Sequence, residues 1–107
     1  MIYQQTATLM ANLQTELTRL NYWQTDALPA SAFASTAPFC CDTMTLQQWL
    51  QFVFMPKMLQ LIIEQQPLPR KIAIAPFAEI AFANESSTVQ PLIQLLKEID
   101  TLLSSQR

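Results

Sequence analysis

The chain has 107 residues and a net charge of −2, and 50% of its residues are hydrophobic while only 13% are charged. It has no glycine, which excludes the Gly-rich phosphate loops of nucleotide-binding folds, and no histidine, which removes the commonest general base and metal ligand. The six lysines and arginines are scattered, without the basic face that independent nucleic-acid binding needs, and we expect no metal and no cofactor.

The length favours a single domain over residues 1–107. Cys40 and Cys41 are adjacent, which disfavours normal disulfide geometry and indicates free thiols in a reducing compartment. We recognise no signal peptide, and the longest apolar run, residues 72–83, is much shorter than the ~20 residues of a membrane span. We therefore expect a cytoplasmic protein.

The first predicted element is an amphipathic helix over residues 2–22. Apolar residues recur there at spacings of three and four, as one face of a helix requires. This face consists of Ile2, Thr6, Leu9, Met10, Leu13, Leu17 and Leu20. It predicts one wall of the hydrophobic core.

A long irregular segment follows, over residues 24–41. Proline at position 29 favours a short helical turn as far as Phe33, and we expect Phe33 and Phe39 to pin the segment to the helices. Long ordered loops are often functional. The segment is therefore either a surface that a partner recognises or a packed crossover between helices.

We expect residues 43–65 to form a kinked helix in the middle of the bundle. Asp42, Thr43 and Thr45 precede a dense apolar run and could cap its first turn. Its apolar residues lie on several sides, which is typical of a buried helix. Pro56 removes a backbone donor and should kink the helix.

Two further helices complete an all-α bundle of about four helices. One is predicted over residues 76–84, with Phe77, Ile80 and Ala81 facing inward. The last should begin at a capping box formed by Ser87 and Gln90. Its apolar stripe contains Val89, Leu92, Ile93, Leu96, Ile99 and Leu103, with Asp100 at its edge. Without glycine, Asn21 and Asn84 are the expected left-handed residues.

The chain resembles the YqcC-like family of small all-helical bacterial proteins of uncharacterised function. The resemblance covers nearly the whole chain and rests on Trp23, Pro38-Phe39, Asp42-Thr43-Met44, Trp49-Leu50-Gln51, Pro56, Met58, Pro67-Leu68-Pro69, Ala75-Pro76 and Glu79. It implies a helical fold and no known catalytic residues. Members are often encoded beside a tRNA pseudouridine synthase, which implies an accessory role in tRNA modification with the enzyme as partner.

Three functions fit these patterns. A non-catalytic protein-interaction module is favoured by the low charge, the long loop and the two tryptophans. The alternative is a bundle that binds a small molecule or lipid near Pro56, in a pocket lined by Phe52, Met55 and Met58. An enzyme would need a pair of carboxylates for acid–base catalysis, for which only Asp42 and Glu79 qualify. We expect the protein not to be an enzyme.

The candidate binding residues come from the motifs above. Trp23 lies at a helix end and is the tryptophan expected to be exposed. Trp49 shares one apolar stripe of the 43–65 helix with Leu46, Leu50 and Val53 and is expected to be buried. The full set is Trp23, Phe39, Asp42, Trp49, Gln51, Pro56, Met58 and Glu79. Formation of a homo-oligomer is a further alternative, because a bundle with spare apolar surface can dimerise.

Overall fold

The computed structural model describes residues 2–34, 44–84 and 87–106, and these residues form helices and connecting turns without a strand. The elements in chain order are α1 (Ile2–Arg19), η1 (Ala30–Phe33), α2 (Leu46–Trp49), η3 (Leu50–Phe54), α3 (Met55–Ile63), α4 (Ile74–Ala81), η4 (Ser87–Val89) and α5 (Gln90–Ser104). Since α2, η3 and α3 are continuous, the helices form four rods, which confirms the predicted all-helical bundle.

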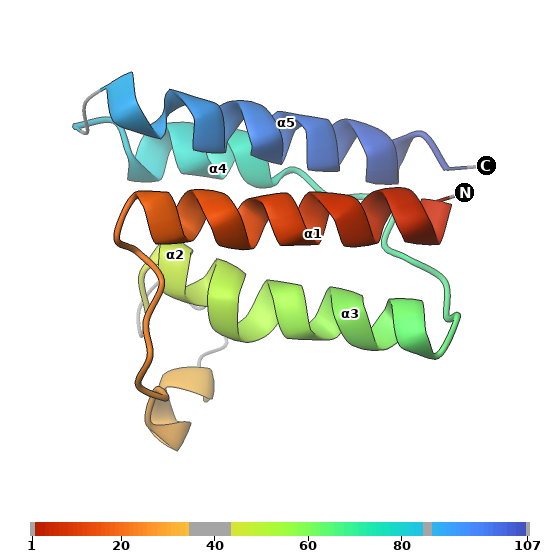
Figure 1. The fold of residues 1–107 in the computed structure, drawn as a ribbon, viewed down its shortest axis with the longest axis horizontal. Helices are drawn as coiled ribbons and strands as arrows, with labels where there is room; N and C mark the ends of the chain where they lie inside the picture. Colours follow the sequence, from red (N-terminus) through yellow and green to blue (C-terminus); the bar gives the residue numbers. More distant parts are fainter. Residues whose placement is uncertain (1, 35–43, 85–86, 107) are drawn as a thin grey trace.

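The rod in the middle is α1 rather than the run from α2 to α3. Figure 1 shows α4 and α5 on one side of α1 and the α2–η3–α3 run on the other. The helix contacts agree, because α1 packs against both α5 and α3. The two ends of the described chain lie at the same end of the bundle (Figure 1).

The apolar stripes of α1 and α5 form the core. The stripe predicted for α5 is buried throughout, and that of α1 is buried over its central part. The largest fully buried apolar side chains are Met10, Leu13, Leu17, Leu50, Met58, Ile74, Leu92, Leu96, Ile99 and Leu103. Thr6 is also buried, and its hydroxyl donates to the carbonyl of Ile2 over 2.7 Å, so this buried hydroxyl has a hydrogen-bond partner. No helix among the described residues is long and apolar enough to cross a membrane.

The irregularity expected near Pro56 takes the form of a π-helical turn, η3. The Met55 N–H donates to the carbonyl of Leu50, five residues back. In a regular α-helix, the ring of Pro56 would crowd the carbonyl of Phe52, and the wider turn directly before the proline relieves this contact. The helix begins later than predicted, with Thr45 as its N-cap. Leu50, Phe54 and Met55 are buried, as expected of a helix with apolar residues on several sides.

Two helices end in Schellman motifs built without glycine. After α1, Asn21 is left-handed with φ 62°, and the Tyr22 N–H donates to Leu17 over 2.8 Å. After α3, the left-handed residue is Gln65 with φ 54°. The prediction for Asn21 is confirmed, whereas Asn84 does not have the positive φ that we expected.

The predicted inward face of α4 is wrong for Ile80 and Ala81, whereas Phe77 is half-buried and packs against the core. The helix starts at Ile74, before the predicted position 76, and it buries Ile74, Ala75 and Ala78. Ile80 is 75% exposed and Ala81 is also exposed. The reason is that a side chain of α5 fixes the first turn of α4, as described below, and this sets which face of α4 meets the core.

Two local predictions also fail. The N-cap of α5 is Val89 and has no side-chain cap, so the predicted capping box does not start this helix, which follows the 3-10 turn η4. The helical turn after Pro29 exists as η1, but Phe33 is 45% exposed and the buried residue of the turn is Ala32. Small Ala32 fits against its neighbours where the larger Phe33 turns outward. Phe39 lies outside the described residues.

Candidate functional site

The candidate site forms where the segment after α1 crosses the start of the α2–η3–α3 run. Gln51 lies in the π-helical turn and is only 8% exposed. Its Oε1 accepts from the Gln24 N–H over 2.8 Å, and its Nε2 donates to the Gln24 carbonyl over 2.7 Å. The side-chain amide of Gln51 therefore forms hydrogen bonds with both the N–H and the carbonyl of Gln24, as the backbone of a neighbouring strand does in a sheet. This contact fixes the chain directly after Trp23.

A second glutamine ties the same residue to the start of α2. Thr45 and Gln48 form a capping box, in which the Thr45 hydroxyl accepts from the Gln48 N–H and the Gln48 side chain accepts from the Thr45 N–H. The Gln48 Nε2 then donates to the Gln24 Oε1 over 2.7 Å. We call Gln24, Gln48 and Gln51 the glutamine junction.

The two candidate tryptophans lie beside this junction. Trp23 precedes Gln24 and Trp49 lies between the other two glutamines. Both are half-buried and pack against the core, so the expected contrast in their exposure is absent. The Trp49 ring stacks on Phe54, with centroids 5.4 Å apart. The structure thus brings Trp23, Trp49 and Gln51 together.

Other candidates lie elsewhere. Met58 is a core residue at 1% exposure, while Pro56 is exposed one turn beyond the junction. Glu79 is exposed on α4, where its carboxylate lies 3.3 Å from the Lys97 ammonium. Phe39 and Asp42 lie outside the described residues, as does any pairing of Asp42 with Glu79.

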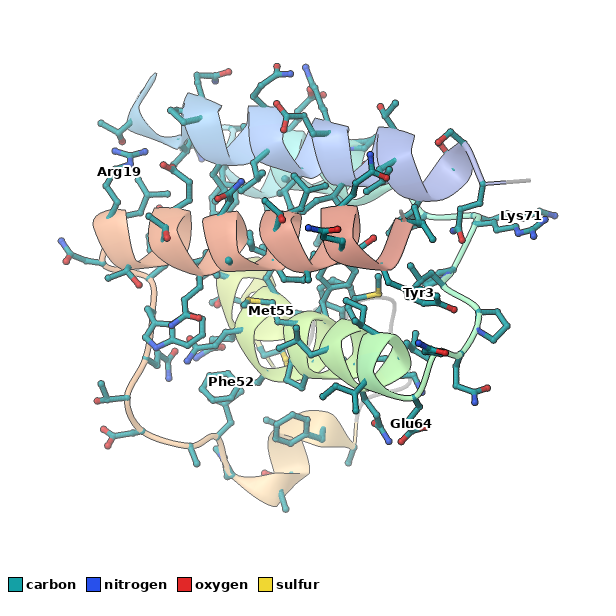
Figure 2. The ribbon with its side chains drawn as sticks, turned by 45° about the vertical axis from the view of Figure 1, so that its right-hand side comes forward. Tyr3, Arg19, Phe52, Met55, Glu64 and Lys71 are labelled. Carbon is teal, nitrogen blue, oxygen red and sulfur yellow. The ribbon has the colours of Figure 1, made fainter. Side chains whose placement is uncertain are left out.

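Of the three residues expected to line a ligand pocket near Pro56, Met55 lines a hollow in the structure, and Phe52 and Met58 do not line that hollow. A hollow of about 170 Å³ lies between α1 and α3, with Met55 in its wall. Figure 2 shows Met55 on the side of its rod that faces α1, and Phe52 on the side toward η1. Phe52, Met55 and Met58 therefore do not converge on one cavity.

One contact that the sequence analysis missed is made by Asp100. Its two carboxylate oxygens accept from the N–H groups of Ile74 and Ala75, at 3.0 and 2.8 Å. A residue of α5 thus caps α4, and its negative charge lies at the positive end of that helix. The available signal was an acidic residue at the edge of an otherwise apolar stripe.

The cations of the described chain do not form a common surface. Arg19 pairs with Glu16 at 2.8 Å and donates to the carbonyl of Thr88, and the hydrogen bond to Glu16 raises the pKa of its guanidinium. Figure 2 places Arg19 and Lys71 at opposite ends of the molecule. Over residues 2–34, 44–84 and 87–106, no group of three or more Cys, Asp or Glu is arranged to hold a metal ion.

Known proteins resemble this chain over most of its length. The DUF446 family model, described as tRNA pseudouridine synthase C, matches residues 5–102. An uncharacterised protein of Haemophilus influenzae is 40% identical over 101 residues, which are 94% of each chain. The uncharacterised protein YqcC of Escherichia coli is 35% identical over 92 residues, covering 86% of this chain and 84% of that one.

Two further comparisons concern the fold and a longer protein. The solution NMR structure of YqcC from E. coli matches with a TM-score of 0.88 at 30% identity, covering 99% of this chain and 91% of that one. A tRNA pseudouridine synthase C of Pectobacterium carotovorum is 45% identical over 49 residues, which are 46% of this chain and 13% of that protein.

Proposed function

The chain belongs to the YqcC-like family, DUF446, and from this premise we propose that it is a non-catalytic accessory protein whose partner is a tRNA pseudouridine synthase. The observation that carries the proposal is the match inside the synthase of P. carotovorum. Its 49 matched residues are 13% of that protein, so a segment similar to this chain shares a polypeptide with a much longer remainder. A module joined covalently to an enzyme in one protein is a natural binding partner of that enzyme in another.

The glutamine junction and its tryptophans supply a surface of the right kind. Tryptophan is enriched among the residues that dominate binding energy at protein interfaces. Gln51 holds both backbone groups of Gln24, which keeps the half-buried Trp23 in place before any partner arrives. A surface that is already ordered loses less conformational entropy on binding.

Direct binding to RNA is a poorer fit than binding to the enzyme. Affinity for nucleic acid depends on several cations that meet neighbouring phosphates. Here Arg19 and Lys97 are engaged with Glu16 and Glu79, and the net charge of the chain is −2. The enzyme would supply the contacts to the tRNA, and this protein would contact the enzyme.

Binding of a small molecule near Pro56 is the second candidate, and its support is the hollow beside Met55. That hollow measures about 170 Å³. Pockets for small ligands usually have about 300–1,000 Å³. The volume therefore favours the protein partner, and native mass spectrometry of the purified protein tests the alternative through the presence of a bound mass.

The test is a titration of the purified protein with a purified tRNA pseudouridine synthase C from the same organism, by isothermal calorimetry. We expect saturable binding that Trp23→Ala weakens by about thirtyfold or more, since hot-spot truncations cost about 2 kcal/mol or more and 1.4 kcal/mol is tenfold. Ile80→Ala is the control, because this side chain is exposed on α4, away from the junction.

Circular dichroism separates lost binding from lost folding. Trp23 packs against the core, so its variant must show a native melting transition at the temperature of the titration. Gln24→Ala serves as a second variant, because it removes the contact with Gln48 and leaves the backbone groups that Gln51 holds. No heat of binding with the wild-type protein would exclude the proposed partner.

A further inference from the structure

A groove runs along the exposed side of α1 and α5. These two helices lie side by side and antiparallel (Figure 1). Two hollows of about 380 and 430 Å³ lie between them, and Glu98 lines both, so they join into one groove, the α1–α5 groove. It extends from Glu16 and Pro91 at one end to Gln4 and Leu102 at the other. This length corresponds to about 17 Å of helix, or about three turns.

The floor of the groove is apolar and its rim is polar. Leu95 is only 8% exposed, and Leu9 and Leu102 are half-buried. Apart from these leucines, Pro91 and the two glutamates, the lining side chains carry amides and hydroxyls. Interfaces between proteins have this composition, with an apolar centre and a polar, solvated rim.

The centre of the groove carries one uncompensated negative charge. Glu98 is exposed and forms no hydrogen bond or ion pair within the described residues. The other carboxylate of the groove, Glu16, pairs with Arg19 at 2.8 Å. Lys97 lies 3.3 Å from Glu79 of α4 and lines neither hollow. A cation that complements Glu98 must therefore come from another molecule.

We propose that the α1–α5 groove binds a helix of another protein that carries a lysine or arginine between apolar side chains. A groove between two helices receives the ridge of side chains of a third helix. A helix also satisfies its own backbone hydrogen bonds, whereas an extended segment would place unpaired N–H and carbonyl groups over the leucines.

The spacing along α5 defines the pattern of the partner helix. Leu95 and Leu102 are two helical turns apart, and Glu98 lies between them. A partner helix with two apolar residues two turns apart, and a cation midway, matches all three positions at once. The apolar residues cover the leucines, and the cation pairs with the carboxylate of Glu98.

Other occupants lack this complementarity. A two-fold interface pairs one patch with itself, so a second copy seated through this groove would bring carboxylates together and supply no lysine or arginine. Nucleic acids and anionic lipid surfaces carry the same sign of charge as the groove. The inference goes beyond the proposed function and does not depend on it, because the groove lies outside the glutamine junction.

A nuclear magnetic resonance titration of the isotope-labelled protein with a synthetic helix tests the proposal. The peptide has about fifteen residues, mostly alanine, with two leucines two helical turns apart and an arginine midway. A cross-link on its outer side holds it helical, so that little ordering entropy opposes binding. We expect a dissociation constant below ~1 mM, with saturable shifts at the amides of Thr8, Asn12 and Glu98. The amides of Leu59 and Ile63 on α3 should stay unchanged.

A charge exchange tests the role of Glu98. A second peptide with glutamate in place of the arginine should bind the wild-type protein ~5- to 10-fold more weakly, because like charges then meet. Glu98→Lys should reverse this preference. Glu64→Lys is the matched control, because it makes the same change of charge at an exposed residue at the end of α3 and should keep the wild-type preference.

A third peptide tests the apolar floor without changing the protein. Replacing both leucines of the arginine peptide by alanine should weaken binding by ~10-fold or more, because less apolar surface leaves water. Equal binding of the two peptides would mean that charge alone attracts the helix, and this would overturn the docking on the leucines.

Each remaining outcome decides for or against the partner helix. No shift with the arginine peptide at ~1 mM would overturn the proposal, as would shifts confined to α3 or to the glutamine junction. A Glu98→Lys variant that still prefers the arginine peptide would overturn the role of Glu98. Groove amides that shift with the concentration of the protein alone would assign the groove to a second copy instead.

Discussion

Different interactions attach the rest of the chain to the two sides of α1. On one side, α4 and α5 pack through regular apolar stripes, and the α5 stripe is buried throughout. On the other, the chain after α1 meets the α2–η3–α3 run through side-chain amides, and α3 leaves Leu59 and Ile63 in solvent. The first side supplies more of the buried core, whereas the second has an ordered polar surface and leaves apolar side chains exposed.

We expect the packing of α4 and α5 against α1 to contribute most of the free energy of unfolding. Leu96 has no exposed surface, so Leu96→Ala should lower the free energy of unfolding by ~3 kcal/mol or more through lost burial and a cavity. Urea denaturation followed by circular dichroism measures the loss. Leu59→Ala, the same change at a 40% exposed site on α3, should cost less than ~1 kcal/mol. Equal losses would remove the distinction between the two sides.

The amide side should respond next most strongly to Gln51→Ala. This change leaves the N–H and carbonyl of Gln24 without their partner, which should cost ~2 kcal/mol. Hydrogen exchange of the Gln24 amide should accelerate more than that of amides in α5. Gln60→Ala is the control, because the side chain of this exposed glutamine donates to the neighbouring Glu64 over 3.1 Å. Unchanged exchange at Gln24 would contradict the role given to Gln51.

The smallest effect sharpens the comparison, because the α5 side also contains polar contacts, among them that of Asp100 with the start of α4. Asp100→Asn keeps the size of the side chain and loses the charge and one acceptor, which should cost ~1 kcal/mol. Faster exchange at Ile74 and Ala75 would locate the loss at the start of α4. Glu98→Gln on the same helix is the control and should leave both amides as they are.

The periodic elements could be predicted because their pattern and their packing coincide. The stripes of residues 2–22 and 89–103 describe the buried faces of α1 and α5, and Asn21 takes the left-handed geometry expected in a chain without glycine. The irregularity near Pro56 was also foreseeable, since proline lacks a donor. Its form, a π-helical turn, was not.

The site was predictable only in part. Trp23, Trp49 and Gln51 were chosen from a family resemblance, and they do lie together, whereas Met58 belongs to the core and Glu79 to a surface ion pair. Gln24 and Gln48, which complete the junction, carry no pattern of their own. Glutamine occurs throughout this polar surface, and nothing local distinguishes the ones that bond across the fold.

The sequence by itself determined the helices, their number and the buried faces of the first and the last, because helix formation and amphipathic burial depend on spacings of three and four residues. The tertiary structure alone decided the start and orientation of α4, which Asp100 of α5 sets from 26 residues away. It likewise decided the contact between Gln24 and Gln51 across 27 residues, and the exposure of Ile63. These features depend on which groups meet in space, and no local spacing encodes that meeting.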